Sequence, residues 1–452
     1  MLRIGTLTTA VLFILSLALY QAGAGDARTV FTLLAVTGIF LGLHYQDRFP
    51  RALRAAWVFA LPVTAIGFAL ESAERVGVNL RKLPEWDYLG FWLHARTAVL
   101  GGDFYDPASA QALVAPYDVG IAFRREIVDV GFWYPPPTMF LFWPLGLADP
   151  AAALPWWYGL QVLAAVASVF LLRRLFFPGG GPAEWLACAA LLCATHGTYE
   201  TFHFSQTNFV ALLLVLLFWG RNGTAAGGAW LASAVFVKPF IALLAFGPLI
   251  GRQWRAVLGF GLATVALLVA SGLAFGGDAL AGWLDWDRIQ AKPQWIYSQP
   301  TNQSLLGLVL RSTRTACRGL ECLTHPIFVS GAAVLAAATT ALAVPLARAR
   351  EHEWTTALFL LFALIVYPVS QLFYTVLLLP PALLAWTRRD RVPGGGPALA
   401  VVLGLVFALA ALDRGRASVF AYLLMWGVIA AMGLVLVRVP RPAVTEAAAG
   451  VA

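Results

Sequence analysis

Long apolar runs recur along almost the whole 452-residue chain and are separated by short loops that carry arginines. A helix needs about 20 apolar residues to cross a bilayer, although shorter helices occur inside membrane proteins. By this rule the candidate spans are 3–21, 29–45, 53–71, 152–172, 183–198, 207–221, 224–237, 239–251, 256–275, 326–346, 354–369, 372–387, 397–412 and 418–438. Because several are short, we expect about 11–14 transmembrane helices in an all-α integral membrane protein.

The charge content supports a membrane protein and argues against a soluble domain and against a nucleic-acid-binding protein. Only 12% of the residues are charged and 60% are hydrophobic, whereas soluble domains carry about 25% charged residues. The net charge of +8 does not indicate a nucleic-acid partner, because the arginines are spread in small groups between the apolar runs. That spread is typical of cytoplasmic loops in membrane proteins.

The basic groups occupy alternate loops, with the loop of Arg414 and Arg416 as the exception. By the positive-inside rule these loops are cytoplasmic, so the two long loops, 72–151 and 276–325, are predicted to be extracytoplasmic. This orientation requires that residues 138–149 do not cross the membrane. They are too few to cross and contain a proline, so we expect a re-entrant or interfacial piece.

These spans and loops divide the chain into six parts. They are N-terminal transmembrane helices (1–71), a first extracytoplasmic loop with interfacial helices (72–151), central transmembrane helices (152–275), a second extracytoplasmic loop (276–325), C-terminal transmembrane helices (326–441) and a disordered tail (442–452). The run 2–20 could be a signal peptide, but another span follows it at once, which favours an uncleaved helix.

The four cysteines form two pairs with different surroundings. Cys188 and Cys193 lie inside an apolar run and are expected to be packed thiols. Cys317 and Cys322 lie in a polar loop, where an oxidising compartment could join them. No spacing of cysteine and histidine resembles a metal site, so we expect neither a metal nor another cofactor.

Residues 84–137 form the longest polar interruption and contain the best candidate base. The apolar residues that recur at helical spacing there are Trp86, Leu89, Leu93 and Leu100, with Thr97 as the one mildly polar member of the row. Such a stripe is typical of a helix at the membrane interface, and Asp87, Phe91 and His94 fall on a neighbouring face. Beside apolar walls, Asp87 would have a raised pKa suited to a general base. The alternative is a solvated or helix-capping carboxylate.

Several motifs follow one another from Asp87 onward. They are Asp87-Tyr88, His94-Ala95-Arg96, Gly101-Gly102-Asp103-Phe104-Tyr105-Asp106-Pro107, Tyr134-Pro135-Pro136-Pro137, Gln206-Thr207-Asn208, Lys238-Pro239 and Asn302-Gln303-Ser304. In this order and spacing they resemble the polyprenyl-phosphate-mannose-dependent alpha-mannosyltransferases of glycosyltransferase family 87, in the GT-C superfamily. The resemblance covers roughly residues 84–385.

The resemblance implies a GT-C-type polytopic bundle and an enzyme of the inner (plasma) membrane of a bacterium. Its implied reaction is a metal-independent, inverting transfer of a hexose, expected to be mannose, from a polyprenyl monophosphate to a lipid or glycan acceptor on the extracytoplasmic side. Asp87 occupies the acidic position that deprotonates the acceptor. Such a displacement needs a carboxylate on one face of the sugar and positive charge at the leaving phosphate.

Four basic residues are candidates for binding the phosphate of the sugar donor. Lys238 lies in the apolar stretch 235–240, at a predicted extracytoplasmic turn, where an uncompensated ammonium is costly; its alternative is a lysine that snorkels to the interface. Arg96 matches the family's arginine in the first loop, or is a surface charge. Arg311 and Arg314 in the second loop contact phosphate or acceptor, or are solvated loop charges.

The residues expected to bind sugar or acceptor are His94, Tyr134, His203, Gln206, Asn208, Asn302, Ser304 and Tyr374. For Gln206 and Asn208 the alternative is capping of the following helix, and for His203 it is a structural hydrogen bond. The late family motif Ser-Trp-x-His-Tyr is Ser-Gln-Leu-Phe-Tyr at 370–374 here. Phe373 therefore occupies the position of the family's histidine. Either Tyr374 or another loop residue takes over the role of that histidine, or the donor and acceptor differ from those of the mannose-dependent enzymes.

Two other functions compete with this interpretation. A transporter or flippase of lipid-linked sugars would place ionisable residues near the midplane, whereas these candidates collect at one face. A non-catalytic scaffold would leave Asp87 and Lys238 freely replaceable. Asp285-Trp286-Asp287 resembles the metal-binding Asp-x-Asp of nucleotide-sugar transferases, but the chain has no glycine-rich nucleotide signature, so we interpret it as an interfacial acid pair.

Overall fold

The protein is described by a computed structural model that covers residues 27–83, 87–114, 132, 134–285, 294–391, 395–412 and 418–438. These residues form helices joined by short loops, and no β-strand occurs among them. Six helices in these ranges are long and apolar enough to cross a membrane, namely α2 (Ala27–Tyr45), α3 (Arg51–Arg81), α8 (Pro150–Phe176), α14 (Trp254–Phe275), α20 (Pro326–Arg348) and α24 (Ser418–Arg438). The protein is therefore an all-α, multi-pass membrane protein.

Shorter apolar helices fill the space between the long ones. They are α9 (Pro182–Ala194), α11 (Asn208–Trp219), α12 (Ala225–Val237), η2 (Pro239–Ala245) with α13 (Phe246–Ile250), α21 (His352–Val366), η3 (Leu372–Leu378) with α22 (Leu379–Thr387), and α23 (Gly395–Ala411). The remaining elements are α4 (Asp87–Val99), α5 (Pro107–Val114), η1 (Pro136–Thr138), α7 (Met139–Gly146), α10 (His196–His203), α15 (Gly277–Trp283), α17 (Gln294–Ser298), α18 (Leu305–Thr313), α19 (Leu320–Leu323) and η4 (Arg389–Arg391).

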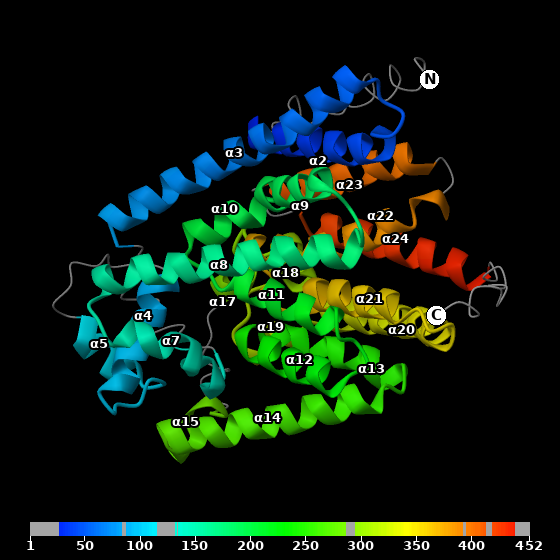
Figure 1. The fold of residues 1–452 in the computed structure, drawn as a ribbon. Coiled ribbons are helices and arrows are strands. Elements are labelled where there is room, and N and C mark those ends of the chain that lie inside the picture. The colour runs from blue at the N-terminus through cyan, green and yellow to red at the C-terminus, as the bar shows by residue number, and fades with distance from the viewer. Residues whose placement is uncertain are drawn as a thin grey trace, which may run out of the picture.

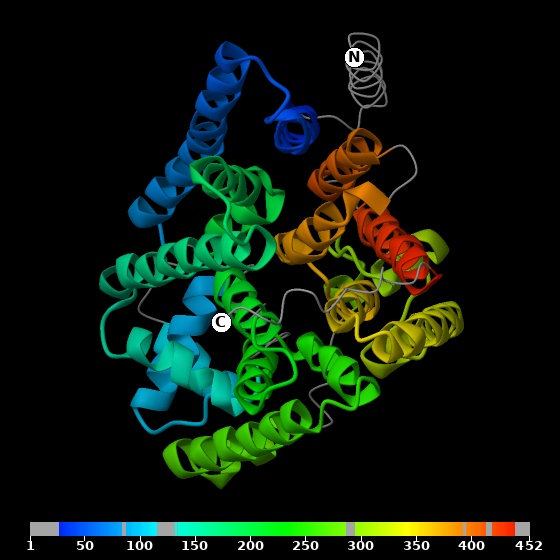
Figure 2. The same cartoon turned by 45° about the vertical axis from the view of Figure 1, so that its right-hand side comes forward.

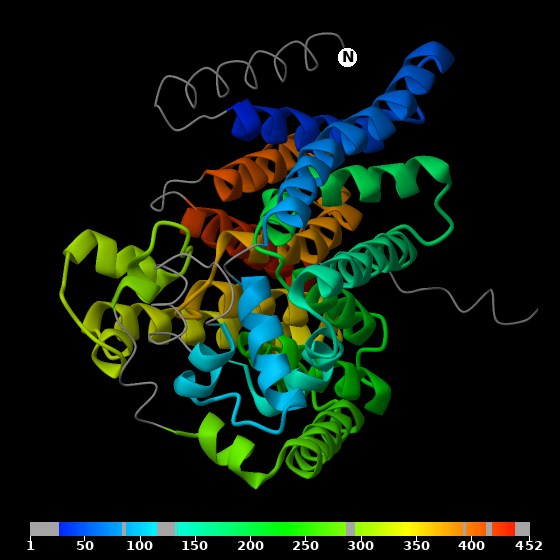
Figure 3. The same ribbon diagram turned by 90° about the vertical axis from the view of Figure 1, so that its left-hand side faces the viewer.

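The long helices run roughly side by side, and α4, α5 and α7 gather at one end of the bundle (Figure 1). In Figures 1 and 2, α3 and α14 lie on opposite sides of the molecule. Viewed toward that end in Figure 3, α4 and α5, drawn in cyan, lie in front of the central helices. This end brings together the two long loops of the sequence, and it holds the candidate active site.

Burial separates central helices from lipid-facing ones. Every residue of α21 from Trp354 to Ile365 is buried, and so is every residue of α22 from Leu379 to Trp386. Apolar side chains of α14 and α20 are instead exposed, with Leu273 84% and Val334 70% accessible. A helix that is apolar all round and buried lies inside the bundle, while exposed apolar faces suit the hydrocarbon of the bilayer.

Several predicted spans have different bounds in the structure. Helix α3 continues past the predicted end at residue 71 to Arg81, so its 31 residues are about 46 Å long and exceed the bilayer core. The predicted span 183–198 is broken, because α9 ends at Ala194 and α10 begins at His196. Of residues 138–149, Thr138 ends η1 and the eight-residue helix α7 follows, which is too short to cross a bilayer. The predicted span 3–21 and tail 442–452 lie outside the described residues.

Glycines allow α12 and α14 to pack closely. The close contact predicts that a larger residue at such a glycine lowers the free energy of unfolding. A Cβ on Gly228 would lie 2.0 Å from the carbonyl oxygen of Ala256, whereas one on Gly261 would meet no atom within 4 Å. We expect Gly228→Ala to destabilise the protein by about 1–3 kcal/mol, because backbone must move apart. Thermal unfolding in detergent measures the effect. Gly261→Ala is the matched control, and equal unfolding temperatures for the two variants would contradict the packing.

Candidate active site

A cavity of about 360 Å³ opens at the end of the bundle where the two long loops meet. Its walls come from distant parts of the chain, including the start of α4, the turn between α12 and η2, and the loop between α21 and η3. The lining residues are Asp87, Tyr134, Phe204, Gln206, Lys238, Pro239, Trp295, Ile296, Gln299, Thr301, Tyr367, Val369, Gln371, Leu372, Phe373 and Tyr374. The cavity thus holds one carboxylate and one ammonium among aromatic and amide side chains.

A single glutamine connects the carboxylate to the ammonium. Lys238 Nζ donates to Gln206 Oε1 at 2.7 Å and to the hydroxyl of Tyr134 at 3.2 Å. The side chain of Gln206 also hydrogen-bonds to the Asp87 carboxylate. Since a carboxylate only accepts, the Gln206 amide nitrogen donates to Asp87 while its oxygen accepts from Lys238. The acid and the cation are therefore held in one hydrogen-bonded unit.

Aromatic rings surround the ammonium of Lys238. Its Nζ lies 5.4 Å from the ring centroids of both Tyr134 and Phe373, and 4.9 Å from that of Tyr374. A cation close to aromatic rings is attracted by their quadrupoles, and the attraction is larger when water is excluded. Lys238 is only 2% exposed. These contacts, together with Asp87, stabilise a charge that would be costly if left uncompensated.

Local sequence explains why Lys238 lies at this point. Proline cannot donate the next helical hydrogen bond and disfavours helical geometry in the preceding residue. Helix α12 accordingly ends at Val237, Lys238 adopts an extended conformation, and Pro239 begins η2. The hydroxyl of Thr138 donates to the carbonyl of Phe236 and so links η1 to this turn.

Gln206 is placed by a tight turn after α10. Ser205 has φ of 56°, in the left-handed region that non-glycine residues rarely occupy. Its carbonyl accepts from the Trp157 indole at 2.7 Å, and its hydroxyl lies 2.7 Å from the hydroxyl of Tyr158. These two bonds from α8 hold the turn that directs Gln206 into the cavity.

Burial changes the proton affinities of the two charged groups, which lie outside the membrane-spanning helices. It raises the pKa of the Asp87 carboxyl above its ordinary value of 3.8, and the Gln206 hydrogen bond and the Lys238 charge partly offset this rise. Burial likewise lowers the pKa of Lys238 below its ordinary value of 10.5, against the attraction of Asp87. The two shifts move the pKa values of Asp87 and Lys238 toward neutral pH, as is common for groups at functional sites.

Five of the thirteen predicted site residues line the cavity, namely Asp87, Tyr134, Gln206, Lys238 and Tyr374. The structure does not bring the other eight to its wall. In the first loop, a ring nitrogen of His94 lies 2.8 Å from the carbonyl oxygen of Phe104, and Arg96 donates to the carbonyl of Gly146 at 3.0 Å. Both side chains therefore hold the loop around α4 and α7 together.

Helix α4 also differs from the predicted interfacial helix. It packs against α7 and is buried on almost all sides, and Leu93, in the predicted apolar stripe, is buried beside its polar neighbours His94 and Thr97. Leu100, assigned to the same stripe, is 58% exposed. The helix is therefore buried on more sides than the predicted stripe, because the loop encloses it with its own aromatic residues. Trp86 lies outside the described residues.

His203 and Asn208 stabilise α10 rather than line the cavity. His203 Nε2 lies 2.7 Å from an Arg75 guanidinium nitrogen, and Asn208 donates to the Thr201 hydroxyl at 3.0 Å. The capping alternative is wrong for Asn208, because the N-cap residue of α11 is Thr207, which makes no side-chain capping bond.

Asn302 and Ser304 join the second loop to the end of α21. Asn302 donates to the carbonyls of Tyr297 and Pro368, both at 2.7 Å. Ser304 donates to the same Pro368 carbonyl at 3.1 Å and caps α18 by accepting from Gly307 at 3.0 Å. Their bonds hold two loops that contribute cavity walls.

Neither arginine of this loop lines the cavity. Arg311 donates to the carbonyl of Gln299, a lining residue, at 2.9 Å, and Arg314 is exposed at the end of α18. Cys317 and Cys322 are joined in a disulfide, which settles the alternative left open by the sequence. Among the described residues no cluster of three or more acidic, histidine or cysteine side chains could hold a metal. Of the Asp285–Asp287 motif only Asp285 is described.

Some lining residues were not predicted, among them Phe204, Gln299, Thr301 and Tyr367. Tyr367 had a recognisable signal, because it precedes a proline at the end of an apolar run. Trp295 also lines the cavity and is 43% exposed. The remaining three carry no signal beyond their position in polar loops.

Comparison with known proteins places this architecture in a family. The family model for glycosyltransferase family 87 matches residues 132–370, more than half of the chain. An alpha-(1->3)-arabinofuranosyltransferase of Mycolicibacterium smegmatis is 28% identical over 189 residues, which cover 39% of this chain and 44% of the relative. The corresponding protein of Corynebacterium glutamicum is 29% identical over 146 residues, 31% of this chain and 35% of the relative.

The chain thus spans less than half the length of these curated relatives. A relative of the same name from Mycobacterium tuberculosis (strain H37Rv) is 30% identical over 156 residues, 32% of this chain and 35% of that protein. No solved structure matches the chain. The family match includes the lining residues from Tyr134 to Val369, whereas Asp87 and the lining residues 371–374 lie outside it. The protein belongs to glycosyltransferase family 87.

Proposed function

We propose that the protein is a membrane glycosyltransferase that moves a sugar from a polyprenyl monophosphate to a hydroxyl of a lipid or glycan acceptor. The observation that carries this proposal is the cavity in which Gln206 joins Asp87 to Lys238. A carboxylate and a buried cation in one cavity are the two groups that a single displacement at a phosphate-activated sugar requires.

In this reaction Asp87 accepts the proton of the acceptor hydroxyl as the acceptor oxygen bonds to the anomeric carbon. The bond from that carbon to the phosphate oxygen breaks, and its electron pair leaves on the phosphate. Lys238 stabilises the negative charge that grows there, and the hydroxyl of Tyr134 beside Nζ helps to fix the ammonium. Attack and departure on opposite faces of the sugar invert the anomeric centre.

The transferred sugar is proposed from the relatives and the cavity walls. The three relatives described above are named as arabinofuranosyltransferases, which favours an arabinofuranosyl group over the mannosyl group suggested by the sequence motifs. Trp295, Tyr367 and Phe373 give the cavity aromatic faces on which a sugar ring can stack. Phe373, at the position of the family's histidine, supplies an apolar surface there.

We place this reaction on the extracytoplasmic side of a bacterial inner membrane. The arginine-rich short loops are assigned to the cytoplasm, which leaves the loops that form the cavity on the other side. The disulfide of Cys317 and Cys322 lies in the second of these loops, and disulfides persist in oxidising compartments.

The reaction is tested with purified protein, radiolabelled polyprenyl-phosphate arabinofuranose or polyprenyl-phosphate mannose, and a membrane glycolipid extract as acceptor. Release of polyprenyl phosphate with label in a new glycan or glycolipid is the expected result, with the arabinofuranosyl donor preferred and no loss of activity in EDTA. Slow transfer to water gives a second readout that needs no acceptor. Activity only with a nucleotide sugar would disprove the lipid donor.

The two shifted proton affinities predict a bell-shaped pH dependence of kcat/KM. As pH falls through the raised pKa of Asp87 the base becomes protonated, so the acid limb should lie above pH 3.8. As pH rises through the lowered pKa of Lys238 the cation is lost, so the alkaline limb should lie below pH 10.5. Lys238→Arg should move only the alkaline limb upward, because a guanidinium stays protonated. An unmoved alkaline limb would exclude Lys238 as its origin.

A further inference from the structure

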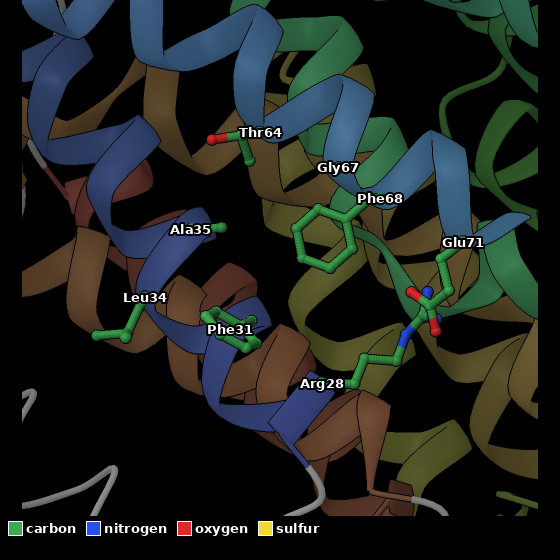
Figure 4. Close-up of a pocket in the computed structure, with 8 residues that line it drawn as sticks. All are labelled: Arg28, Phe31, Leu34, Ala35, Thr64, Gly67, Phe68 and Glu71. Carbon is green, nitrogen blue, oxygen red and sulfur yellow. The ribbon is translucent and has the colours of Figure 1, made fainter.

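A second cavity, of about 650 Å³, lies between α2 and α3 and shares no lining residue with the cavity around Asp87 (Figure 4). Helix α2 contributes Arg28, Phe31, Leu34 and Ala35, and α3 contributes Thr64, Gly67, Phe68 and Glu71. We call this the α2–α3 groove. Its apolar part is open to the surroundings, since Phe31 is 62% and Leu34 is 42% exposed.

At one end of the groove Arg28 is buried with unused hydrogen-bond donors. Its side chain is only 9% exposed, and one guanidinium nitrogen pairs with Glu71. Within the part of the chain that the structure describes, Nε and Nη2 of Arg28 are buried and have no hydrogen-bond partner. Leaving buried donors of a charged group unpaired is costly. Their presence indicates an acceptor that comes from outside these residues.

The orientation of this guanidinium is fixed. Its central carbon lies 4.4 Å from the ring centroid of Tyr199 on α10 and 5.9 Å from that of Phe68. Figure 4 shows Arg28 and Glu71 reaching toward each other across the end of the groove. Aromatic stacking and the ion pair together hold the arginine in place, as expected for a planar donor that presents its remaining N–H groups to a phosphate.

The position along the helices corresponds to the level of lipid headgroups. The apolar stretch 55–70 of α3, which begins after Arg54, rises about 24 Å, and Glu71 follows it directly. This length is close to the roughly 30 Å of a hydrocarbon core. Arg28 stands at the beginning of the apolar helix α2. Phe31, Leu34 and Phe68 therefore line the groove on the hydrocarbon side of the charged pair.

We propose that the α2–α3 groove binds a zwitterionic phospholipid of the ethanolamine type. Its phosphate accepts hydrogen bonds from Arg28, its ammonium lies against Glu71, and one acyl chain follows the groove. Glu71 is 42% exposed, so it is available to a cation, and it would repel a lipid that carries only negative charge. A free phosphate would leave the apolar part of the groove empty. This site is additional to the proposed transfer reaction and does not depend on it.

Native mass spectrometry of the full-length protein, purified in mild detergent and mixed with equal amounts of phosphatidylethanolamine and phosphatidylglycerol, measures the bound lipid. We expect one retained phosphatidylethanolamine. Arg28→Gln should weaken its retention about tenfold or more, because charge-assisted bonds to the phosphate are lost. Glu71→Gln should abolish the preference over phosphatidylglycerol.

A steric variant tests the groove without touching either charge. A Cβ on Gly67 would meet no atom within 4 Å, so Gly67→Leu can fill the groove without disturbing the packing. It should lose the lipid, whereas Gly261→Leu, at an equally open glycine of α14, should retain it. Equal retention by all variants, no retention by the wild type, or a preference for phosphatidylglycerol would overturn the proposal. So would a cross-link showing that residues 3–21 fill the groove.

Discussion

Replacing Asp87 by asparagine is expected to lower kcat/KM for sugar transfer by about 10²–10⁴-fold. Asparagine keeps the shape of the side chain and still accepts a hydrogen bond from Gln206, but it cannot take the acceptor proton. Donor binding should change little, because the proposed phosphate ligand is Lys238 on the other side of Gln206. The measurement is steady-state transfer from the labelled polyprenyl-phosphate donor, with donor affinity determined separately.

The matched control is Asp278→Asn, an exposed acid of α15 that does not line the cavity. It should transfer sugar at the wild-type rate. If Asp87→Asn retains wild-type kcat/KM while remaining folded by thermal unfolding, Asp87 is not the base. A comparable loss in both variants would point to a general effect of charge in the loops instead.

Replacing Lys238 by methionine is expected to lower kcat by about 10²–10³-fold, because the charge that grows on the leaving phosphate loses its closest cation. The KM for the donor should rise and that for the acceptor should stay the same. Methionine retains most of the volume in the aromatic surroundings formed by Tyr134 and Tyr374. The two KM values are measured by varying one substrate at saturation of the other.

Two further variants distinguish catalysis from folding at this position. Lys238→Arg retains a cation and should recover part of the activity, although the planar guanidinium does not reproduce both hydrogen bonds of the ammonium. Lys82→Met removes an exposed lysine after α3 and should have no effect. If Lys238→Met and Lys238→Arg were equally inactive and equally unstable, the role of Lys238 would be structural.

The helices of the fold were predictable to different degrees. The long spans were found because about twenty apolar residues in a row satisfy the bilayer by themselves, whatever their neighbours are. The predicted spans 239–251 and 372–387 instead begin as the 3₁₀ segments η2 and η3. Such segments depend on being enclosed by other helices, and hydropathy alone does not report that enclosure.

The residues of the candidate site were also predictable only in part. Asp87, Gln206 and Lys238 were chosen from motifs, and all three line one cavity. Arg96 and Asn302 belong to motifs of the same kind, yet their side chains bind backbone carbonyls. A motif indicates that a polar side chain is present in a loop. Whether this side chain lines a cavity or hydrogen-bonds to the backbone depends on which distant segments pack beside it.

The sequence by itself determined that the chain is an apolar, multi-pass helical protein of this family, because helix length, apolar composition and motif order are local properties. Only the tertiary structure decided that Gln206 links Asp87 to Lys238, that α4 is enclosed, and that Arg28 meets Glu71 at the end of a groove. The physical reason is that hydrogen bonds and buried charges act over a few ångströms between residues far apart in the chain. Their partners exist only after the helices have packed.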